Sequence, residues 1–206
     1  MKKKKIRSLL CFMMAVLMLS LTACSTSDEG SEDKEATEVL LPVSIGGIEI
    51  KVGETTIQSL MDQGLEISWV DEEYNRIIVD PTTELEAKTY YTGGSIDLSD
   101  NVFFKVSFVT DEKMVPLGEA VIAYIELHVL PDADQSLLDQ IAFDGVPFKE
   151  MTQKKAVEKY SDWSGDEIMW LNYGTDYKYL LTFDIATGDL TGFTVERKYD
   201  VDWTKK

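Results

Sequence analysis

Acid–base chemistry in this chain would have to begin with His128, its single histidine. This residue falls in the alternating segment 121–129, on the same side of a predicted strand as Tyr124 and Glu126. The sequence contains no Gly-x-Ser-x-Gly nucleophile motif and no second histidine to share a zinc ion. We therefore expect His128 to be an ordinary strand residue and the protein to have no enzymatic activity.

Two acidic pairs, Asp97 with Asp100 and Asp132 with Asp134, raise the question of a calcium site. Calcium takes several oxygen ligands from a flexible loop. Neither pair has the Asp-x-Asp-x-Asp-Gly spacing with a distal glutamate that forms a calcium-binding loop. We expect these carboxylates to be solvated, and we predict no metal and no other cofactor.

Large aromatic side chains crowd the last quarter of the sequence, and a tyrosine pair precedes a double glycine earlier in the chain. Tyrosine and tryptophan combine a large contact area with a polar group, so protein interfaces favour them. Alternate strand positions must nevertheless face the core. We expect three of these residues to serve mainly in packing: Trp170, Tyr179 and Phe183. The predicted exposed, partner-binding residues are Trp163, Tyr173, Tyr177 and Tyr91.

A different chemistry is expected at Cys24, which follows Leu21-Thr22-Ala23. Basic residues and then an apolar run at 9–19 precede it, in the order of a secretory signal. The run is too short to span a bilayer comfortably. The Leu-x-Ala-Cys segment resembles the lipobox of bacterial lipoproteins. The resemblance implies that residues 1–23 are a lipoprotein signal peptide. It also implies that Cys24 carries a lipid and anchors the protein to the extracytoplasmic face of the cell membrane.

The chain is strongly acidic, with 20 basic and 37 acidic residues and a formal net charge of −17. Loss of residues 1–23 would remove five basic residues and no acidic ones, which deepens the net charge to −22. A field of this sign repels phosphates, so we exclude nucleic acid as a partner. Because Cys11 lies in the leader and Cys24 at the lipid site, the folded domain has no thiol for a disulfide.

The segment 24–38 reads as a disordered acidic tether, since residues 25–37 carry no apolar side chain larger than alanine. Folding should begin near Val39. The first predicted elements are a strand around 48–52 and a short helix with a capping box formed by Thr55 and Gln58. Later elements include an antiparallel hairpin with strands near 102–108 and 121–129, a helix at 152–160, and closing strands at 167–173, 177–184 and 190–199. The segment 83–100 reads as irregular because Gly93-Gly94 lies at its centre.

A weak internal similarity relates the segments 47–60 and 145–157: each has a glycine, a short apolar strand and a threonine-capped helix. The alternative, that two unrelated stretches share this order by chance, stays open. If it is a duplication, residues 39–131 and 132–206 are two similar modules. The chain resembles small exported lipoproteins of Gram-positive bacteria whose domain is like beta-lactamase inhibitor protein. The resemblance rests on the segments 53–57, 148–152 and 177–195.

That resemblance implies an α+β fold of two similar helix-plus-antiparallel-sheet modules whose sheet and loops bind another protein. The two disulfides of the inhibitor are missing, so inhibition of beta-lactamase is not implied. The leading hypothesis is a membrane-anchored, non-catalytic protein-binding module, which requires an uncovered sheet face. The alternative is a small-molecule or glycan-binding accessory lipoprotein of the cell envelope, which requires a concave pocket. A hydrolytic enzyme would require Asp184 or Glu196 in a cleft with a raised pKa.

Overall fold

Antiparallel strands dominate the computed structural model, which describes residues 39–71, 73–173 and 176–201. Strands make up 45% of it and helices 14%, so the protein is mostly β. The expected α+β fold of two similar helix-plus-antiparallel-sheet modules is therefore wrong. The described residues all fall within one compact unit, residues 36–206.

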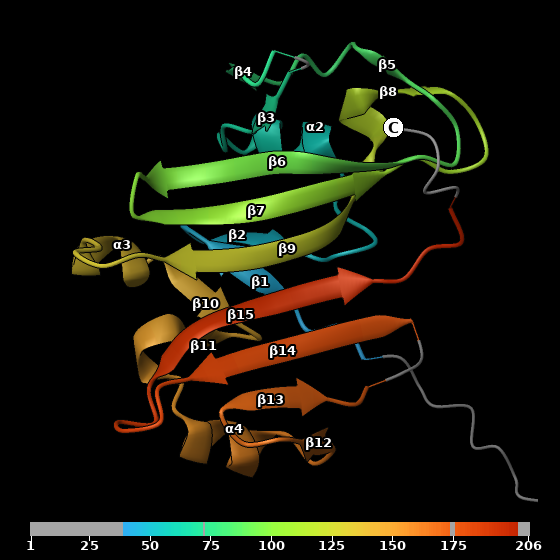
Figure 1. Cartoon of the computed structure of the whole chain (residues 1–206). Helices are drawn as coiled ribbons and strands as arrows, with labels where there is room; N and C mark the ends of the chain where they lie inside the picture. Colours follow the sequence, from blue (N-terminus) through green and yellow to red (C-terminus); the bar gives the residue numbers. More distant parts are fainter. Residues whose placement is uncertain (1–38, 72, 174–175, 202–206) are drawn as a thin grey trace, which may run out of the picture. The chain divides into compact units, whose positions relative to one another are not determined.

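One nine-stranded antiparallel sheet takes strands from almost the whole length of the described chain (Figure 1). Its strand order is β12 (Trp163–Ser164), β13 (Ile168–Leu171), β14 (Tyr177–Phe183), β15 (Leu190–Arg197), β9 (Val121–Val129), β7 (Val102–Val109), β6 (Tyr90–Ser99), β3 (Ser68–Val70) and β4 (Arg76–Ile78). The pairing of β15 with β9 joins the C-terminal strands to the earlier ones. The predicted strands at 102–108, 121–129, 167–173, 177–184 and 190–199 therefore belong to one continuous sheet, whereas the strand predicted around 48–52 is β2 (Ile48–Ile50) of a second sheet.

A four-stranded sheet lies behind the large one in Figure 1, in the order β11 (Val146–Pro147), β10 (Ile141–Phe143), β1 (Val43–Ile45) and β2 (Ile48–Ile50). A two-stranded sheet pairs β5 (Glu84–Leu85) with β8 (Val115–Pro116). The helices are short: α2 (Ile57–Asp62), α3 (Gln135–Leu138), α4 (Gln153–Lys159) and the 3₁₀ turns Leu117–Glu119 and Phe148–Glu150. The helix predicted after Thr55 and the helix predicted at 152–160 are both present, as α2 and α4. Helices this short leave the fold mostly β.

The core fills the space between the two larger sheets. Phe143 on β10 packs against Phe193 on β15, with ring centroids 5.4 Å apart, and against the edge of Tyr179 at 6.4 Å. Phe193 in turn contacts Phe104 on β7 at 6.2 Å. All four rings are almost fully buried, and burial of large apolar surfaces of this kind is the main favourable contribution to folding.

The internal similarity noted in the sequence corresponds to a local structural repeat. Thr56 caps α2 by accepting a hydrogen bond from Ser59 N at 3.2 Å, and Thr152 caps α4 by accepting one from Lys155 N at 3.2 Å. Each capping residue also forms an isolated antiparallel bridge, Thr56 to Val121 at the start of β9 and Thr152 to Asp189 just before β15. The predicted cap of the first helix was Thr55, one residue too early; its hydroxyl instead accepts a hydrogen bond from Lys51 N.

The segment expected to be irregular contains β6, the longest strand in the described chain. The double glycine does not break this strand but fits it to its neighbour. Gly93 has a φ of +88° and lies at the irregularity in the β6–β7 register. A Cβ on Gly94 would come within 2.8 Å of a Val106 methyl and 2.9 Å of its carbonyl oxygen. Glycine at this position therefore allows the backbones of β6 and β7 to approach closely.

Candidate functional site

One face of the nine-stranded sheet is open. On β14 the side chains of Tyr177, Tyr179, Leu181 and Phe183 are buried, whereas the alternate residues between them are only half-buried. The same alternation occurs on β13 and β9. The four-stranded sheet covers the buried side, and among the described elements none crosses the side nearest the viewer in Figure 1. We call this second side the open face.

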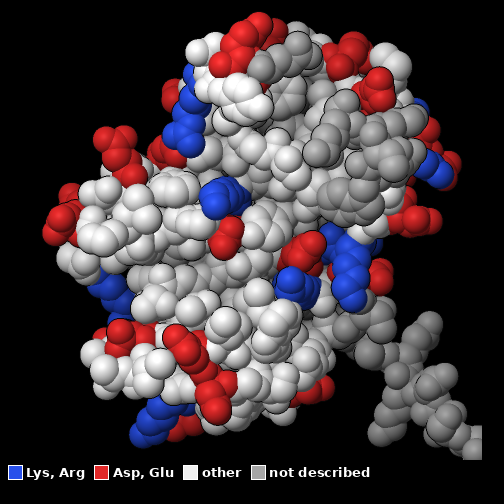
Figure 2. Space-filling view, in the orientation of Figure 1, with Lys and Arg blue, Asp and Glu red and all other residues white. Residues whose placement is uncertain are grey.

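The strand register places one line of directly opposed side chains across the open face. We call this line the central row: Trp170, Leu180, Thr194, Glu126, Lys105, Ser95, Ser68 and Ile78, from β13 to β4. Its two ends are apolar and exposed, with Trp170 42% and Ile78 52% accessible. Its middle is polar, and two of the polar residues, Ser95 and Ser68, are buried, with 3% and 4% of their surface accessible. Figure 2 shows a largely uncharged face with a few isolated charges near its centre and charged groups of both signs around its rim.

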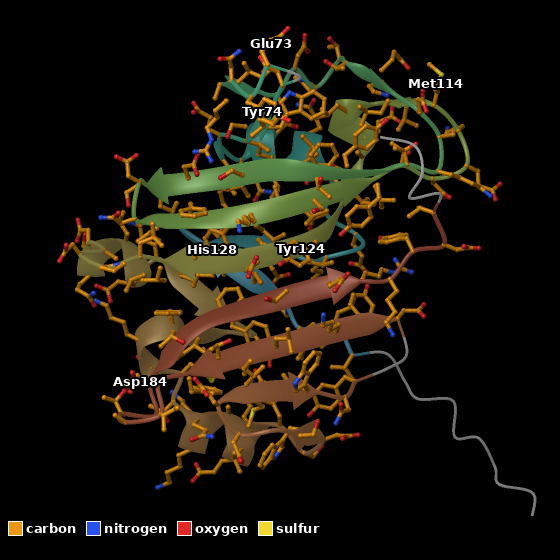
Figure 3. The ribbon with its side chains drawn as sticks, in the orientation of Figure 1. Glu73, Tyr74, Met114, Tyr124, His128 and Asp184 are labelled. Atoms are coloured by element: carbon orange, nitrogen blue, oxygen red, sulfur yellow. The ribbon has the colours of Figure 1, made fainter. Side chains whose placement is uncertain are left out.

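A hydrogen-bonded cluster lies at the centre of the open face, around Glu126. The Tyr124 hydroxyl donates to Glu126 Oε2 at 2.7 Å, and His128 Nε2 lies 3.0 Å from the same oxygen. The His128 contact has ion-pair distance but not the alignment of a good hydrogen bond. The His128 ring stacks flat on Phe103 of β7, with centroids 4.9 Å apart and planes at 2°. Figure 3 shows Tyr124 and His128 along the same strand, β9.

The electrostatics of the cluster keep Glu126 charged and Tyr124 neutral at neutral pH. Burial alone would raise the pKa of Glu126, but the hydrogen bond from Tyr124, together with His128 and Lys105, lowers it below its ordinary value. Desolvation, followed by the hydrogen bond to Glu126, raises the pKa of Tyr124. Tyr124 is therefore a donor and Glu126 an ionised acceptor.

A second polar contact lies beside this cluster. Lys178 Nζ is 3.5 Å from Glu196 Oε2 on the neighbouring strand and 5.2 Å from the centre of the Trp170 ring. The ammonium group therefore connects a carboxylate to the exposed tryptophan, and a cation over an indole face is favourable.

The four sequence-predicted partner-binding residues do not form one surface. Trp163 lies on β12 and is 36% exposed. Tyr173 is half-buried, and its hydroxyl accepts a hydrogen bond from Ser161 N. Tyr91 stacks on Phe108 with centroids 5.6 Å apart. Tyr177 is only 7% exposed, which contradicts its expected exposure. The role of these residues in partner binding stays a prediction.

The packing assignments were partly right. Tyr179 and Phe183 are in the core, as expected, but Trp170 is not: it stands on the open face. Sequence reasoning did place Tyr124 and Glu126 beside His128, but it missed Phe103 and Lys105. Their signal was the alternation of 102–108, in which these two residues fall between buried apolar positions.

A cavity of about 370 Å³ lies apart from the cluster, near the ends of β9 and β15. Its lining is half apolar and half polar: Val129, Leu138, Phe148 and Leu190, with Gln135, Lys149, Asp189 and Thr191. Lys149 Nζ forms an ion pair with Asp139 at 2.8 Å. This size is at the lower end of the range for small-molecule pockets.

One member of each acidic pair has a local structural partner. Asp97 forms an ion pair with Arg76, and Asp134 caps α3 by accepting from Ser136 N at 2.8 Å. Asp184 accepts from the backbone N–H groups of Ala186 and Thr187, and the Thr187 bond is the main cause of its lowered pKa. A raised pKa, as a hydrolase would need, is not found at Asp184. Within 39–71, 73–173 and 176–201, no three His, Cys, Asp or Glu side chains gather as a metal-binding group.

Cys24, the predicted signal peptide and the predicted tether lie outside the described residues. Within the described part of the chain, no helix has the length and apolar character needed to cross a membrane. No protein-family model matches the sequence, and comparisons with curated proteins and with solved structures found no match either.

Proposed function

We propose that this protein is a membrane-anchored, extracytoplasmic lipoprotein that binds a protein partner on the open face of its nine-stranded sheet, without catalysis. The open face is the observation that carries the proposal. Apolar patches on a protein surface frequently mark interaction sites, and here the exposed Trp170 and the half-buried Leu180 lie directly opposite each other on the uncovered side of the sheet. The anchor rests on the sequence pattern that ends at Cys24.

The composition of the face suits a protein partner better than a small molecule. At its centre the Tyr124 hydroxyl is bonded to Glu126 and the His128 ring stacks on Phe103, and aromatic side chains of this kind are enriched in protein interfaces. The face is broad, because the accessible part of the central row runs without a break over five strands, from Trp170 on β13 to Lys105 on β7. A small ligand instead requires a concave site that encloses most of its surface.

Site-specific photo-crosslinking in cells tests the binding face. A benzoylphenylalanine at Thr194, in the central row, should give a discrete adduct with a partner. The same probe at Glu158, exposed on α4, should not. Adducts from Glu158 but none from Thr194 would place the interaction on another surface and contradict the proposal.

The anchor is tested separately. Metabolic labelling with an alkyne fatty acid should tag the protein, and Cys24→Ser should abolish the label and release the protein from the membrane fraction. Retention of both label and membrane association by the variant would contradict lipidation at Cys24.

A second candidate function, binding of a small molecule or glycan, is favoured by the cavity near Phe148 and Leu190. Calorimetric titration with soluble cell-wall fragments tests it. Binding by the parent protein that is lost in Thr191→Arg, which would fill the cavity mouth, would support this function over the first.

A further inference from the structure

Glu126 has an unused side at the centre of the open face. Its Oε2 takes both described contacts, the hydrogen bond from Tyr124 and the approach of His128 Nε2. Among the described residues, no hydrogen bond or ion pair involves Oε1. The side chain is about one-third exposed, so Oε1 can be reached from solvent. Its lowered pKa is consistent with an anionic group at neutral pH.

The surroundings of Glu126 suit a flat cation. The Tyr124 ring lies on one side along β9, and the stacked Phe103 and His128 rings lie on the other. These half-buried rings lower the local dielectric, which strengthens a charge pair made there. Arginine can donate two parallel N–H bonds to a carboxylate while its plane stacks on aromatic rings, which a lysine ammonium cannot do.

Charge complementarity points the same way. The chain has a formal net charge of −17, so its field attracts basic partners and repels acidic ones. We propose that the partner bound on the open face inserts an arginine side chain against Glu126, between Tyr124 and the Phe103–His128 stack. This inference rests on the proposed function and names the partner's key contact.

Lys105 gives the proposal an internal check. It lies directly opposite Glu126 on β7 and is exposed. Its positive charge competes with any incoming cation and would assist an incoming anion. Lys105→Gln should therefore strengthen binding of an arginine probe severalfold. Weaker binding by this variant would contradict a cationic ligand.

The single histidine provides the measurement. Labelling the full-length protein in detergent micelles with [¹³C]histidine gives one imidazole signal, which reports directly on the cluster. At constant pH, N-acetyl-arginine amide should shift this signal in a saturable way. The citrulline analogue, which has the same shape and no charge, should bind about tenfold more weakly.

Glu126→Gln keeps an oxygen that can accept the Tyr124 hydrogen bond, so the sheet should still fold. It should reduce arginine binding to the citrulline level, whereas the control Glu158→Gln should bind arginine like the parent. Equal affinity for arginine and citrulline, no saturable shift, or unchanged arginine binding by Glu126→Gln would overturn the inference. If Thr194 still crosslinks a partner in that event, the open face binds protein without arginine and the proposed function stands; loss of the crosslink removes the proposed function itself.

Discussion

The hydroxyl of Tyr177 donates a hydrogen bond to the carbonyl oxygen of Val52 at 3.1 Å, across 125 positions of sequence. Arg197, opposite Tyr177 on β15, places its Nη1 3.3 Å from the next carbonyl, that of Gly53. Tyr179 acts in the same way, since its hydroxyl accepts from Leu41 N and donates to Val39 O. The C-terminal hairpin therefore fixes the start of the folded chain onto the covered side of the sheet.

Tyr177→Phe should consequently destabilise the fold. The substitution keeps the ring but leaves the buried Val52 carbonyl without its donor, which costs about 1 to 3 kcal/mol. Urea denaturation followed by circular dichroism measures this loss. Tyr173→Phe is the control because its hydroxyl bonds to an exposed backbone N–H, and it should cost less. If Tyr177→Phe unfolds at the parental urea concentration, the hydrogen bond does not contribute to stability.

Trp170→Ala should weaken partner binding but leave the stability of the fold almost unchanged. The indole is exposed on the open face, so its removal should change stability by less than about 1 kcal/mol while it reduces crosslinking from Thr194. Val157→Ala is a matched control, since Val157 is similarly exposed but lies on α4. Undiminished crosslinking by Trp170→Ala would remove this residue from the interface.

Tyr177 and Trp170 show which side-chain positions the sequence could predict and which it could not. Tyr177 and Tyr179 are two positions apart in one strand, so alternation alone places both on the same face. The prediction that Tyr177 is exposed and Tyr179 buried rested only on the preference of interfaces for tyrosine. Trp170 is a different case. Its side follows from its pairing opposite Leu180, and a sequence in which both sides of β13 carry large apolar residues does not define that register.

The fold was predictable to a similar degree. The strands at 102–108 and 121–129 and their hairpin were identified because they alternate strongly. The pairing of β1 with β10, far apart in the chain, and of β9 with β15 involves contacts that local periodicity does not specify. The sequence predicts part of the cluster around Glu126, because Tyr124 and His128 share its strand. Phe103 and Lys105 come from the neighbouring strand, so their position beside Glu126 depends on the strand register.

Gly94→Ala should destabilise the β6–β7 pair. The added methyl group would come within 2.9 Å of the Val106 carbonyl oxygen, which is backbone and has little freedom to move. Overpacking of this kind costs about 1 to 3 kcal/mol. Thermal unfolding measures the change, with Gly192→Ala as the control because its nearest contact, the Leu127 carbonyl oxygen, is at 3.3 Å. Equal melting temperatures for the two variants would show that β7 shifts to accommodate the methyl.

Tyr90 should make the stability of the fold fall in alkaline solution. Burial is the main cause that raises the pKa of Tyr90 from 10.0 to about 12, and the nearby Glu196 and Tyr199 add to it. Above pH 10 the unfolded chain loses the phenolic proton while the folded chain keeps it, so the stability contributed by the neutral ring is lost between about pH 10 and 12. The ring is half-buried and solvent screens part of the effect, so we expect a loss of about 1 to 2 kcal/mol. Urea denaturation at pH 9 and pH 11 should show a smaller difference for Tyr90→Phe than for the parent, and an identical difference would assign the alkaline loss to other groups.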